Sequence, residues 1–349
     1  MKEAKAMMYE ATKLAGARIL VTGGTGFIGS HLLTRLCKAG AHVHAVSRER
    51  QPESNLTIQW YQGDLADLPM VTSLLKAVKP HVIYHLAGHV VGTREAEAIV
   101  PTFHCNLATT VNLLTAAERI GCNRFIVSGS LEEPSSGAGD VVPSSPYAVT
   151  KWAGSAYARM FHALYGFPAV ILRVFMVYGP GQRDLNKLIP YVIGSILKGD
   201  TPKLTSGQRA IDWIYVDDVV DAFLAAALAE NVEGKTIDVG SGRTETVRGV
   251  VHTIARLLEQ HEAPIFGARP DRPLEHVRVA DPHTAEKFLR WTPQVSLQEG
   301  LKRTIDWYER NLGASAGDYA AAVHDEYRTD EADDTYGDPS IPERGLNSR

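Results

Sequence analysis

The residues best suited to acid–base chemistry are Tyr147 and Lys151, in a stretch with a helical pattern that begins after Pro146. A spacing of four residues places both side chains on one face of a helix. An ammonium group beside a phenol stabilises the phenolate, so we expect a lowered pKa for Tyr147 and proton exchange with an alcohol or a ketone. Because this spacing also occurs by chance on ordinary amphipathic helices, its meaning depends on a second motif.

That second motif is a glycine-rich turn, Gly23-Gly24-Thr25-Gly26-Phe27-Ile28-Gly29. An apolar run, 18–22, precedes the turn, and a helical pattern, 30–36, follows it. Glycines permit a tight turn and let the backbone approach a pyrophosphate, whose charge then faces the N-terminus of the helix. A strand, a glycine turn and a helix in this order predict a dinucleotide site.

Short β-rich runs alternate with helical patterns up to residue 174, which is typical of an α/β fold with a Rossmann-type, doubly wound parallel sheet. The runs after 18–22 are 42–46, 56–61, 81–86, 124–128 and 169–174. In such a sheet the ligand binds at the carboxyl ends of the strands. Ser47, Asp64, Ala87, Ser128 and Ser130 fall at these ends.

Beyond residue 181 the alternation is less regular, which predicts a smaller, partly interleaved C-terminal substrate lobe. Helices are expected near 187–198, 217–229, 247–260 and 297–311, with a strand near 236–239. We divide the chain into an N-terminal extension (1–17), an NAD(P)-binding Rossmann domain (18–180), a region that is mainly substrate lobe (181–312) and a tail (313–349). After Ala314 the tail has nine acidic residues against three arginines, which is typical of a flexible, solvated segment.

The composition excludes several classes of protein. With a net charge of −4 and 22% charged residues, the chain has no basic surface of the kind that nucleic acid demands. No apolar run is long enough to span a membrane, and the first sixteen residues do not resemble a targeting segment, so a cytoplasmic protein is expected. Three widely spaced cysteines predict neither a disulfide framework nor a metal site.

Together these motifs resemble the extended short-chain dehydrogenase/reductase family of nucleotide-sugar epimerases, dehydratases and ketoreductases, over residues 18–311. Further landmarks are Gly63-Asp64-Leu65, His85-Leu86-Ala87-Gly88, Asn106, Ser128-Gly129-Ser130, 178–182 and 212–219. The resemblance implies catalysis by Ser130, Tyr147 and Lys151. It implies cofactor contacts from the residues Gly23, Thr25, Gly26, Phe27, Ile28, Gly29, Ser47, Arg48, Asp64, Leu65, Leu86, Ala87, Gly88, Asn106, Ser128, Tyr147 and Lys151.

The end of the second strand bears on the choice of cofactor. An acidic residue there would accept the ribose hydroxyls of NAD, whereas a small residue followed by arginine suits the 2′-phosphate of NADP. Here Ser47 stands where the acid is usual, and Arg48 follows it. We therefore favour NADP(H) and leave NAD(H) open, because the arginine can also belong to a solvated turn.

The segment after Ser130 bears on the reaction. Glu132 lies where dehydratases similar to GDP-mannose 4,6-dehydratase have the glutamate that eliminates water, so it is a candidate catalytic residue. Leu131 lies where glucose-type dehydratases have an acidic residue, which disfavours a dehydratase of the glucose type. GDP-6-deoxy-4-keto-sugar reductases have a similar segment and a similar Ser-Arg turn. Glu132 alone does not decide, since a loop carboxylate can also cap the next segment.

Four residues are predicted to contact the substrate: Met176, Lys187, Arg209 and Arg278. Met176 replaces an asparagine that binds the substrate diphosphate in many relatives, and a thioether cannot donate that hydrogen bond. Ile211 lies where many relatives have an arginine, so Arg209, two residues upstream, is a candidate to supply that charge. Arg278 resembles a second phosphate-binding arginine, and either arginine can alternatively form a surface ion pair.

The leading interpretation is an NADP(H)-dependent oxidoreductase that acts at C4 of a nucleotide-linked sugar as a 4-ketoreductase, with a homodimer expected. The alternatives are a nucleotide-sugar C4 epimerase or a 4,6-dehydratase with tightly retained NAD(P). A non-catalytic, cofactor-sensing protein is the alternative of another class, but a sensor would not need Ser130, Tyr147 and Lys151.

Overall fold

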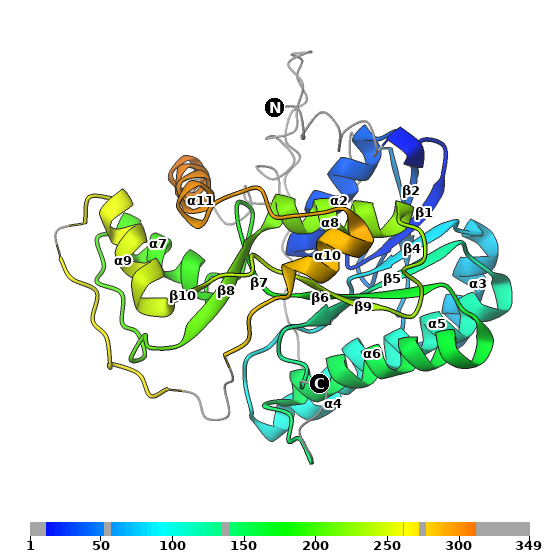
Figure 1. Ribbon diagram of the computed structural model, residues 1–349, viewed down its shortest axis with the longest axis horizontal. Helices are drawn as coiled ribbons and strands as arrows, with labels where there is room; N and C mark the ends of the chain where they lie inside the picture. Colours follow the sequence, from blue (N-terminus) through cyan, green and yellow to red (C-terminus); the bar gives the residue numbers. More distant parts are fainter. Residues whose placement is uncertain (1–11, 52–56, 135–139, 261, 272–276, 312–349) are drawn as a thin grey trace, which may run out of the picture.

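The computed structural model describes residues 12–51, 57–134, 140–260, 262–271 and 277–311. Two sheets organise this part of the chain, a large one and a small one that lie side by side in Figure 1. Most of the predicted N-terminal extension and the whole of the acidic tail lie outside the described residues. The described end of the extension, η1 (Thr12–Leu14), packs on the large sheet, because Leu14 is buried in its core.

The large sheet has seven parallel strands in the order β3-β2-β1-β4-β5-β6-β9. Their bounds are β1 (Arg18–Thr22), β2 (His42–Ser47), β3 (Ile58–Gln62), β4 (Val82–His85), β5 (Arg124–Ser130), β6 (Ala169–Val174) and β9 (Thr236–Val239). The order reverses at β1, and in such sheets ligands bind outside the carboxyl ends of the strands at this switch point.

Helices cover both faces of this sheet, which explains why the sequences of its central strands are continuous apolar runs. One face packs against α2 (Phe27–Lys38), α8 (Val216–Leu228) and α10 (Pro282–Leu289). The other face packs against α3 (Leu68–Val78), α5 (Thr109–Ile120) and α6 (Pro146–Tyr165). Ile19, Leu20 and Val21 are all fully buried, because successive side chains enter opposite cores.

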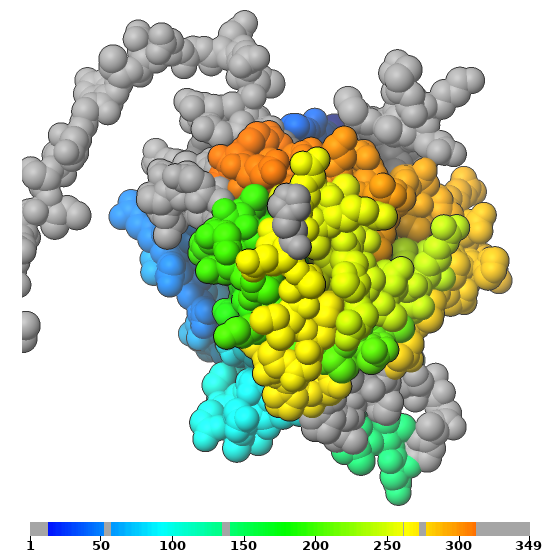
Figure 2. Space-filling view, turned by 90° about the vertical axis from the view of Figure 1, so that its left-hand side faces the viewer, coloured from blue at the N-terminus to red at the C-terminus, as the bar shows by residue number. Residues whose placement is uncertain are grey.

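The small sheet has the order β10-β8-β7, with bounds β7 (Met176–Tyr178), β8 (Ala210–Tyr215) and β10 (Thr244–Thr246). Its core includes residues of α7 (Leu188–Leu197), α9 (Val247–Leu257) and α11 (Leu297–Asn311). In Figure 2, α9 in yellow and α7 in green form the outer face of this lobe, with α11 in orange above them.

The two parts of the fold are interleaved along the chain. β7 follows β6 directly but joins the small sheet, whereas α8, β9 and α10 return to the large one. Asp212 of β8 strengthens the junction, because its buried carboxylate accepts hydrogen bonds from the backbone N–H groups of Ser241, Gly242 and Ala280. The predicted Rossmann-type fold with a smaller, partly interleaved second lobe is therefore confirmed.

Three short helical pieces lie between β4 and α5: η2 (Ala96–Ala98), α4 (Ile99–Thr102) and a π-helical stretch, η3 (Phe103–Ala108). Within the described part of the chain, no helix has the length and apolar character that crossing a membrane requires.

Candidate active site

The candidate catalytic residues meet at the carboxyl end of β5, against the first turns of α6. Ser130 is the last residue of β5. Helix α6 begins at Pro146, and the Ser145 hydroxyl caps it by accepting a hydrogen bond from the Ala148 N–H at 3.1 Å. The Tyr147 hydroxyl is hydrogen-bonded to the Ser130 side chain. The structure thus brings together two hydroxyl groups from different elements, as the predicted catalytic roles of Ser130 and Tyr147 require.

Lys151 follows Tyr147 by one helical turn, and its ammonium donates a short hydrogen bond to the carbonyl oxygen of Ser128. Burial lowers the pKa of Lys151 to about 8, and the negative charge of Glu133 opposes that shift. Burial also raises the pKa of Tyr147 to about 12; its bond with Ser130 opposes this shift, while Glu133 and Glu132 add to it. The expected lowering of the Tyr147 pKa is therefore wrong, because desolvation of the buried phenolate is the largest effect on this group.

Two buried polar side chains hold this region in place. Asn106, in the π-helical stretch, accepts from the His89 N–H at 2.6 Å and donates to the Thr150 hydroxyl at 3.1 Å. It therefore ties the loop after β4 to α6. His85 bridges the hydroxyls of Thr22 and Thr110 at 2.8 and 2.9 Å, and burial and Lys151 together lower its pKa to about 3.

The glycine turn fits a dinucleotide diphosphate. Gly23 has φ +72°, and a Cβ there would lie 2.6 Å from the Ala87 nitrogen. A Cβ on Gly29 would lie 2.1 Å from the Gly23 carbonyl oxygen, so only glycine lets α2 begin this close to the turn. Gly26 caps α2 without a side-chain hydrogen bond, and the first turn has no acidic residue. The amides at this helix end therefore favour an anion.

The other predicted cofactor residues surround the same sheet edge. Ser47 ends β2, and its hydroxyl accepts a hydrogen bond from the Glu49 N–H, while the Arg48 side chain is exposed. Asp64 accepts from the Ala66 N–H at 2.9 Å, which shapes the loop after β3. The remaining positions, Leu65, Leu86, Ala87 and Gly88, follow the carboxyl ends of β3 and β4. Their contacts with a cofactor remain predictions.

On the substrate side, arginines from the second lobe reach the segment after Ser130. Arg209 forms an ion pair with Glu132 at 3.1 Å, and the Ser144 hydroxyl donates to the other Glu132 oxygen at 3.1 Å. Arg278 donates to the backbone carbonyl of Glu133 at 2.7 Å. Both predicted phosphate-binding arginines thus contact Glu132 and Glu133 in this structure, and their binding of a substrate phosphate remains a prediction.

The two other predicted substrate residues lie apart from this ion pair. Met176, partly buried, begins β7 and packs against the core of the small lobe. Lys187 precedes α7, lies 3.8 Å from Asp184 and donates to the Val90 carbonyl at 3.4 Å. Lys187 therefore links the loop after β4 to the second lobe.

Sequence reasoning missed Glu133, which is 3% exposed and accepts a hydrogen bond from the Ser130 N–H at 2.7 Å. The signal available in the sequence was a second carboxylate directly after Glu132, next to Pro134. A glutamate in a loop is normally expected to be exposed to solvent, and only the folded chain reveals that this one is buried.

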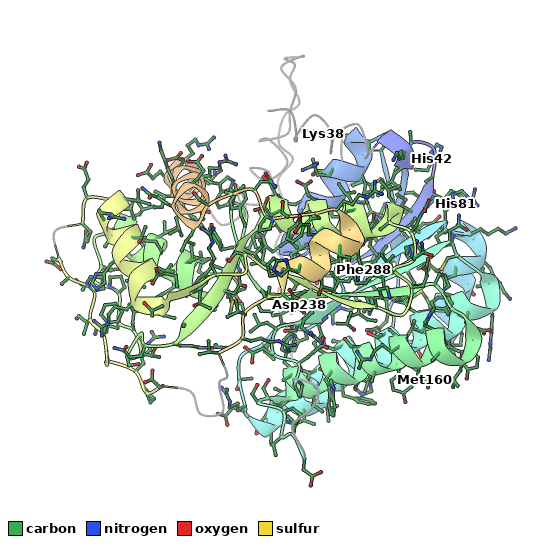
Figure 3. The ribbon with its side chains drawn as sticks, in the orientation of Figure 1. Lys38, His42, His81, Met160, Asp238 and Phe288 are labelled. Carbon is green, nitrogen blue, oxygen red and sulfur yellow. The ribbon has the colours of Figure 1, made fainter. Side chains whose placement is uncertain are left out.

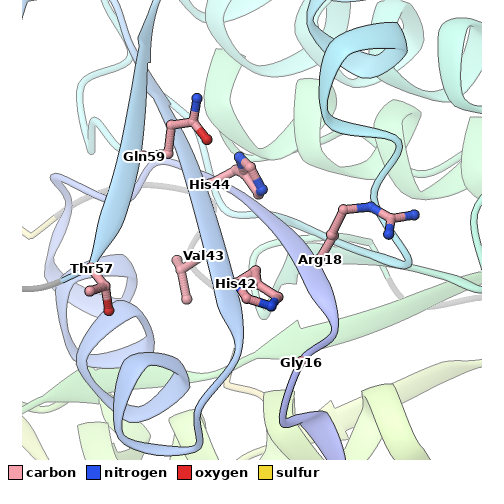
Figure 4. A pocket seen from close by; sticks show the side chains of 7 residues that line it. All are labelled: Gly16, Arg18, His42, Val43, His44, Thr57 and Gln59. Atoms are coloured by element: carbon pink, nitrogen blue, oxygen red, sulfur yellow. The ribbon is translucent and has the colours of Figure 1, made fainter.

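A separate groove of about 430 Å³ lies at the opposite end of the large sheet. Its lining comes from the amino ends of β1 to β3 and comprises Gly16, Arg18, His42, Val43, His44, Thr57 and Gln59 (Figure 4). The candidate catalytic residues are at the carboxyl ends of the strands, so this groove is not part of their site.

Comparison with known proteins agrees with this geometry. Residues 19–240 match the NAD dependent epimerase/dehydratase family. The chain belongs to this family. Membership confirms the resemblance inferred from the motifs, and it makes the chain an enzyme of the extended short-chain dehydrogenase/reductase class.

The relatives of the family named below match more than four-fifths of the chain. UDP-glucose 4-epimerase of Mycolicibacterium smegmatis is 31% identical over 83% of this chain and 98% of that protein. The dTDP-glucose 4,6-dehydratase of the same organism is 32% identical over 84% of this chain and 94% of that protein. UDP-glucuronic acid 4-epimerase from Bacillus cereus, solved with UDP-glucuronic acid and NAD, has a TM-score of 0.75 and 27% identity, covering 84% of this chain and 99% of that chain.

These family members are epimerases and dehydratases, so they do not support the leading interpretation of the chain as a 4-ketoreductase. The family is described as NAD-dependent, so the comparisons do not support the predicted preference for NADP(H) either.

Proposed function

We propose that this chain catalyses epimerisation at C4 of a nucleoside-diphosphate sugar, with the nicotinamide cofactor retained through the reaction cycle. The observation that carries this proposal is the hydrogen-bonded pair of Ser130 and Tyr147 beside Lys151, next to a Glu132 carboxylate whose two oxygens are both engaged. A proton relay is thus available, whereas a free carboxylate for elimination is not. The similarity to 4-epimerases supports the same reaction.

The roles of the residues follow from their positions. Tyr147 exchanges a proton with the C4 oxygen, and the Ser130 hydroxyl shares that oxygen and fixes its distance from the phenol. Lys151 keeps a positive charge close to the developing phenolate. A bound nicotinamide supplies the acceptor and donor of hydride at C4. Because Tyr147 can return the proton that it took, the same group serves both halves of an epimerisation.

Dehydration is less well supported. It requires an acid and a base beside the catalytic serine, but Leu131 occupies one position, and Glu132, at the other, is held by Arg209 and Ser144. A 4-ketoreductase is the second candidate, and Ser47 with the exposed Arg48 supports it. These two residues suit a 2′-phosphate, and an enzyme that consumes reduced cofactor commonly uses NADP(H). We therefore also propose that NADP(H) binds more tightly than NAD(H).

The test is to incubate the purified full chain with UDP-, GDP- and dTDP-hexoses and to follow both the sugar and the nicotinamide absorbance. Epimerisation predicts inversion at C4, with no net change in reduced cofactor and no loss of water. Stoichiometric consumption of NADPH with a 4-keto-6-deoxy sugar would overturn the proposal in favour of the reductase. Formation of a 4-keto-6-deoxy product that stops in Glu132→Gln would instead favour the dehydratase.

We also propose a homodimer formed through the exposed face of α4, the start of η3 and α6. Large apolar side chains gather on this face although each is at least about two-fifths exposed. They are Ile99, Val100, Phe103, Val149, Trp152 and Tyr157. An apolar surface of this kind marks a protein interface, and a two-fold axis buries the same face of both copies. Light scattering of the intact chain and of Val100→Asp tests it, since a monomer in both would contradict the proposal.

A further inference from the structure

Glu133 connects the catalytic strand to the catalytic helix. Its Oε1 accepts hydrogen bonds from the Ser130 N–H at 2.7 Å and from the Ser155 hydroxyl at 3.0 Å. Ser155 follows Lys151 by four residues and Tyr147 by eight, so all three project from one face of α6. One buried carboxylate oxygen therefore fixes β5, which carries Ser130, to α6, which carries Tyr147 and Lys151.

The space for this carboxylate depends on Gly129. A Cβ at Gly129 would lie 2.5 Å from Glu133 Oε1, closer than any van der Waals contact. The glycine between Ser128 and Ser130 therefore leaves room for the Glu133 side chain to fold back under the end of β5. The Glu133 carboxylate occupies the space that a side chain at Gly129 would fill, so a side chain there would displace the carboxylate.

Charged groups from several elements face this carboxylate. Arg173 of β6 places Nε 4.0 Å from Glu133 Oε2, and its Nη1 binds Asp238 of β9 at 2.8 Å. Figure 3 labels Asp238 between the two lobes. Lys151 of α6 lies within electrostatic range of both Glu133 and His85 of β4. The pKa of Glu133 is raised, because the effect of burial outweighs the Ser130 N–H, Arg173, Ser155 and Lys151, which all lower it.

We infer that Glu133 is a positioning residue for the proposed C4 chemistry, whose carboxylate locks Ser130 against the Tyr147–Lys151 face of α6 and keeps Lys151 charged. This assignment rests on the proposed function. The residue contributes geometry through two hydrogen bonds and electrostatics through one buried negative charge. The charge raises the pKa of both Lys151 and Tyr147. Removing it while keeping the shape of the side chain must therefore lower both pKa values.

The test compares Glu133→Gln, Ser155→Ala and Asp238→Asn in the full chain. Glu133→Gln keeps an acceptor for Ser130 but loses the charge, whereas Ser155→Ala loses one hydrogen bond and keeps the charge. Asp238→Asn removes the other carboxylate that binds Arg173, and it touches neither Ser130 nor α6. It is therefore the control for a general loss of stability.

For Glu133→Gln we expect kcat to fall about tenfold or more with KM changed little, and the pH profile of kcat to move to lower pH by roughly half a unit or more. Ser155→Ala should lower kcat and leave the profile in place. Asp238→Asn should change neither. An unmoved profile in Glu133→Gln, or the same shift in Asp238→Asn, would overturn the inference.

A second readout does not depend on the sugar. Competitive labelling of Lys151 at a series of pH values, followed by mass spectrometry, gives the titration midpoint of its amine. We expect this midpoint to fall in Glu133→Gln alone. If it falls while no nucleotide sugar turns over, the proposed function fails and the role of Glu133 stands. If turnover occurs and the midpoint does not move, the role of Glu133 fails by itself.

Discussion

The cofactor side and the substrate side of the site are built in different ways. The glycine turn lies within seven consecutive residues, Gly23 to Gly29, and its fit depends on backbone conformation and on the absence of side chains. The substrate side depends on charged side chains that meet across the fold. Glu132 binds Arg209, 77 residues away, and the Glu133 carbonyl binds Arg278, 145 residues away.

This difference suits the two sides to different tasks, recognition of a cofactor diphosphate and discrimination between related substrates. A backbone turn recognises what all dinucleotides share, namely a diphosphate, and it tolerates no added atoms. Ion pairs between lobes can change partners without changing the fold, so they can distinguish related substrates. We therefore expect substitutions in the turn to affect folding and cofactor binding together, and substitutions in the ion pairs to affect the sugar reaction selectively.

Tyr147 lies where the two sides meet, and its loss should have the largest effect. Tyr147→Phe removes only the exchangeable proton, so turnover should fall by about 10² to 10⁴ while cofactor and sugar binding stay nearly intact. Steady-state kinetics with calorimetry of both ligands separates the two effects. Retention of more than about a tenth of the activity would mean that another residue carries the proton.

The next effect comes from the glycine turn, where the chain offers a matched pair. Gly23 and Gly16 have nearly the same φ, +72° and +71°, but a Cβ meets the Ala87 backbone at Gly23 and nothing within 4 Å at Gly16. Gly16→Ala should cost only the strain of left-handed backbone, about 1 to 2 kcal/mol. Gly23→Ala adds a clash of roughly 1 to 3 kcal/mol and should weaken cofactor binding.

Denaturant unfolding and cofactor titration measure this pair. Equal losses of stability in Gly16→Ala and Gly23→Ala, with cofactor affinity unchanged in both, would show that close approach to Ala87 does not matter.

On the substrate side, Glu132→Gln and Arg209→Met form a double-mutant cycle. The two groups are partly buried at 23% and 19% exposure, so each single change leaves a charge without its partner. We expect each single variant to lower kcat/KM for the sugar about tenfold and the double variant to be no worse, a coupling of about 1.4 kcal/mol. Additive losses would indicate that the residues act on the substrate separately.

The last effect acts on cofactor choice alone. Arg48→Ala should weaken NADP(H) binding by about tenfold or more and leave NAD(H) nearly unchanged, because one charge-assisted contact with a phosphate contributes roughly 1.5 to 3 kcal/mol. Arg50→Ala, two residues further along the same exposed turn, is the control. Equal affinity of the unaltered chain for both cofactors, measured by calorimetry, would remove the basis for this preference.

The sequence by itself determined the fold and the cofactor side. Strand runs and helical periodicity predicted the strands of the large sheet to within a few residues, because both faces of that sheet are covered and its strands must be apolar. The glycine turn and the Tyr147–Lys151 spacing are local patterns, and the geometry that they impose is also local. Ser130 was predicted from the resemblance of Ser128-Gly129-Ser130 to the family's strand end on the same edge.

Only the tertiary structure decided the electrostatics and the substrate side. The sequence predicted a lowered pKa for Tyr147 from its neighbour Lys151, but burial, which no local pattern reports, raises it instead. Glu133 was missed because its partners, Ser130, Ser155 and Arg173, come from three elements that become neighbours only when β5, α6 and β6 pack together. Spacing along a chain fixes what lies one helical turn away, whereas the dielectric surroundings and the charge partners of a side chain depend on every element that folds around it.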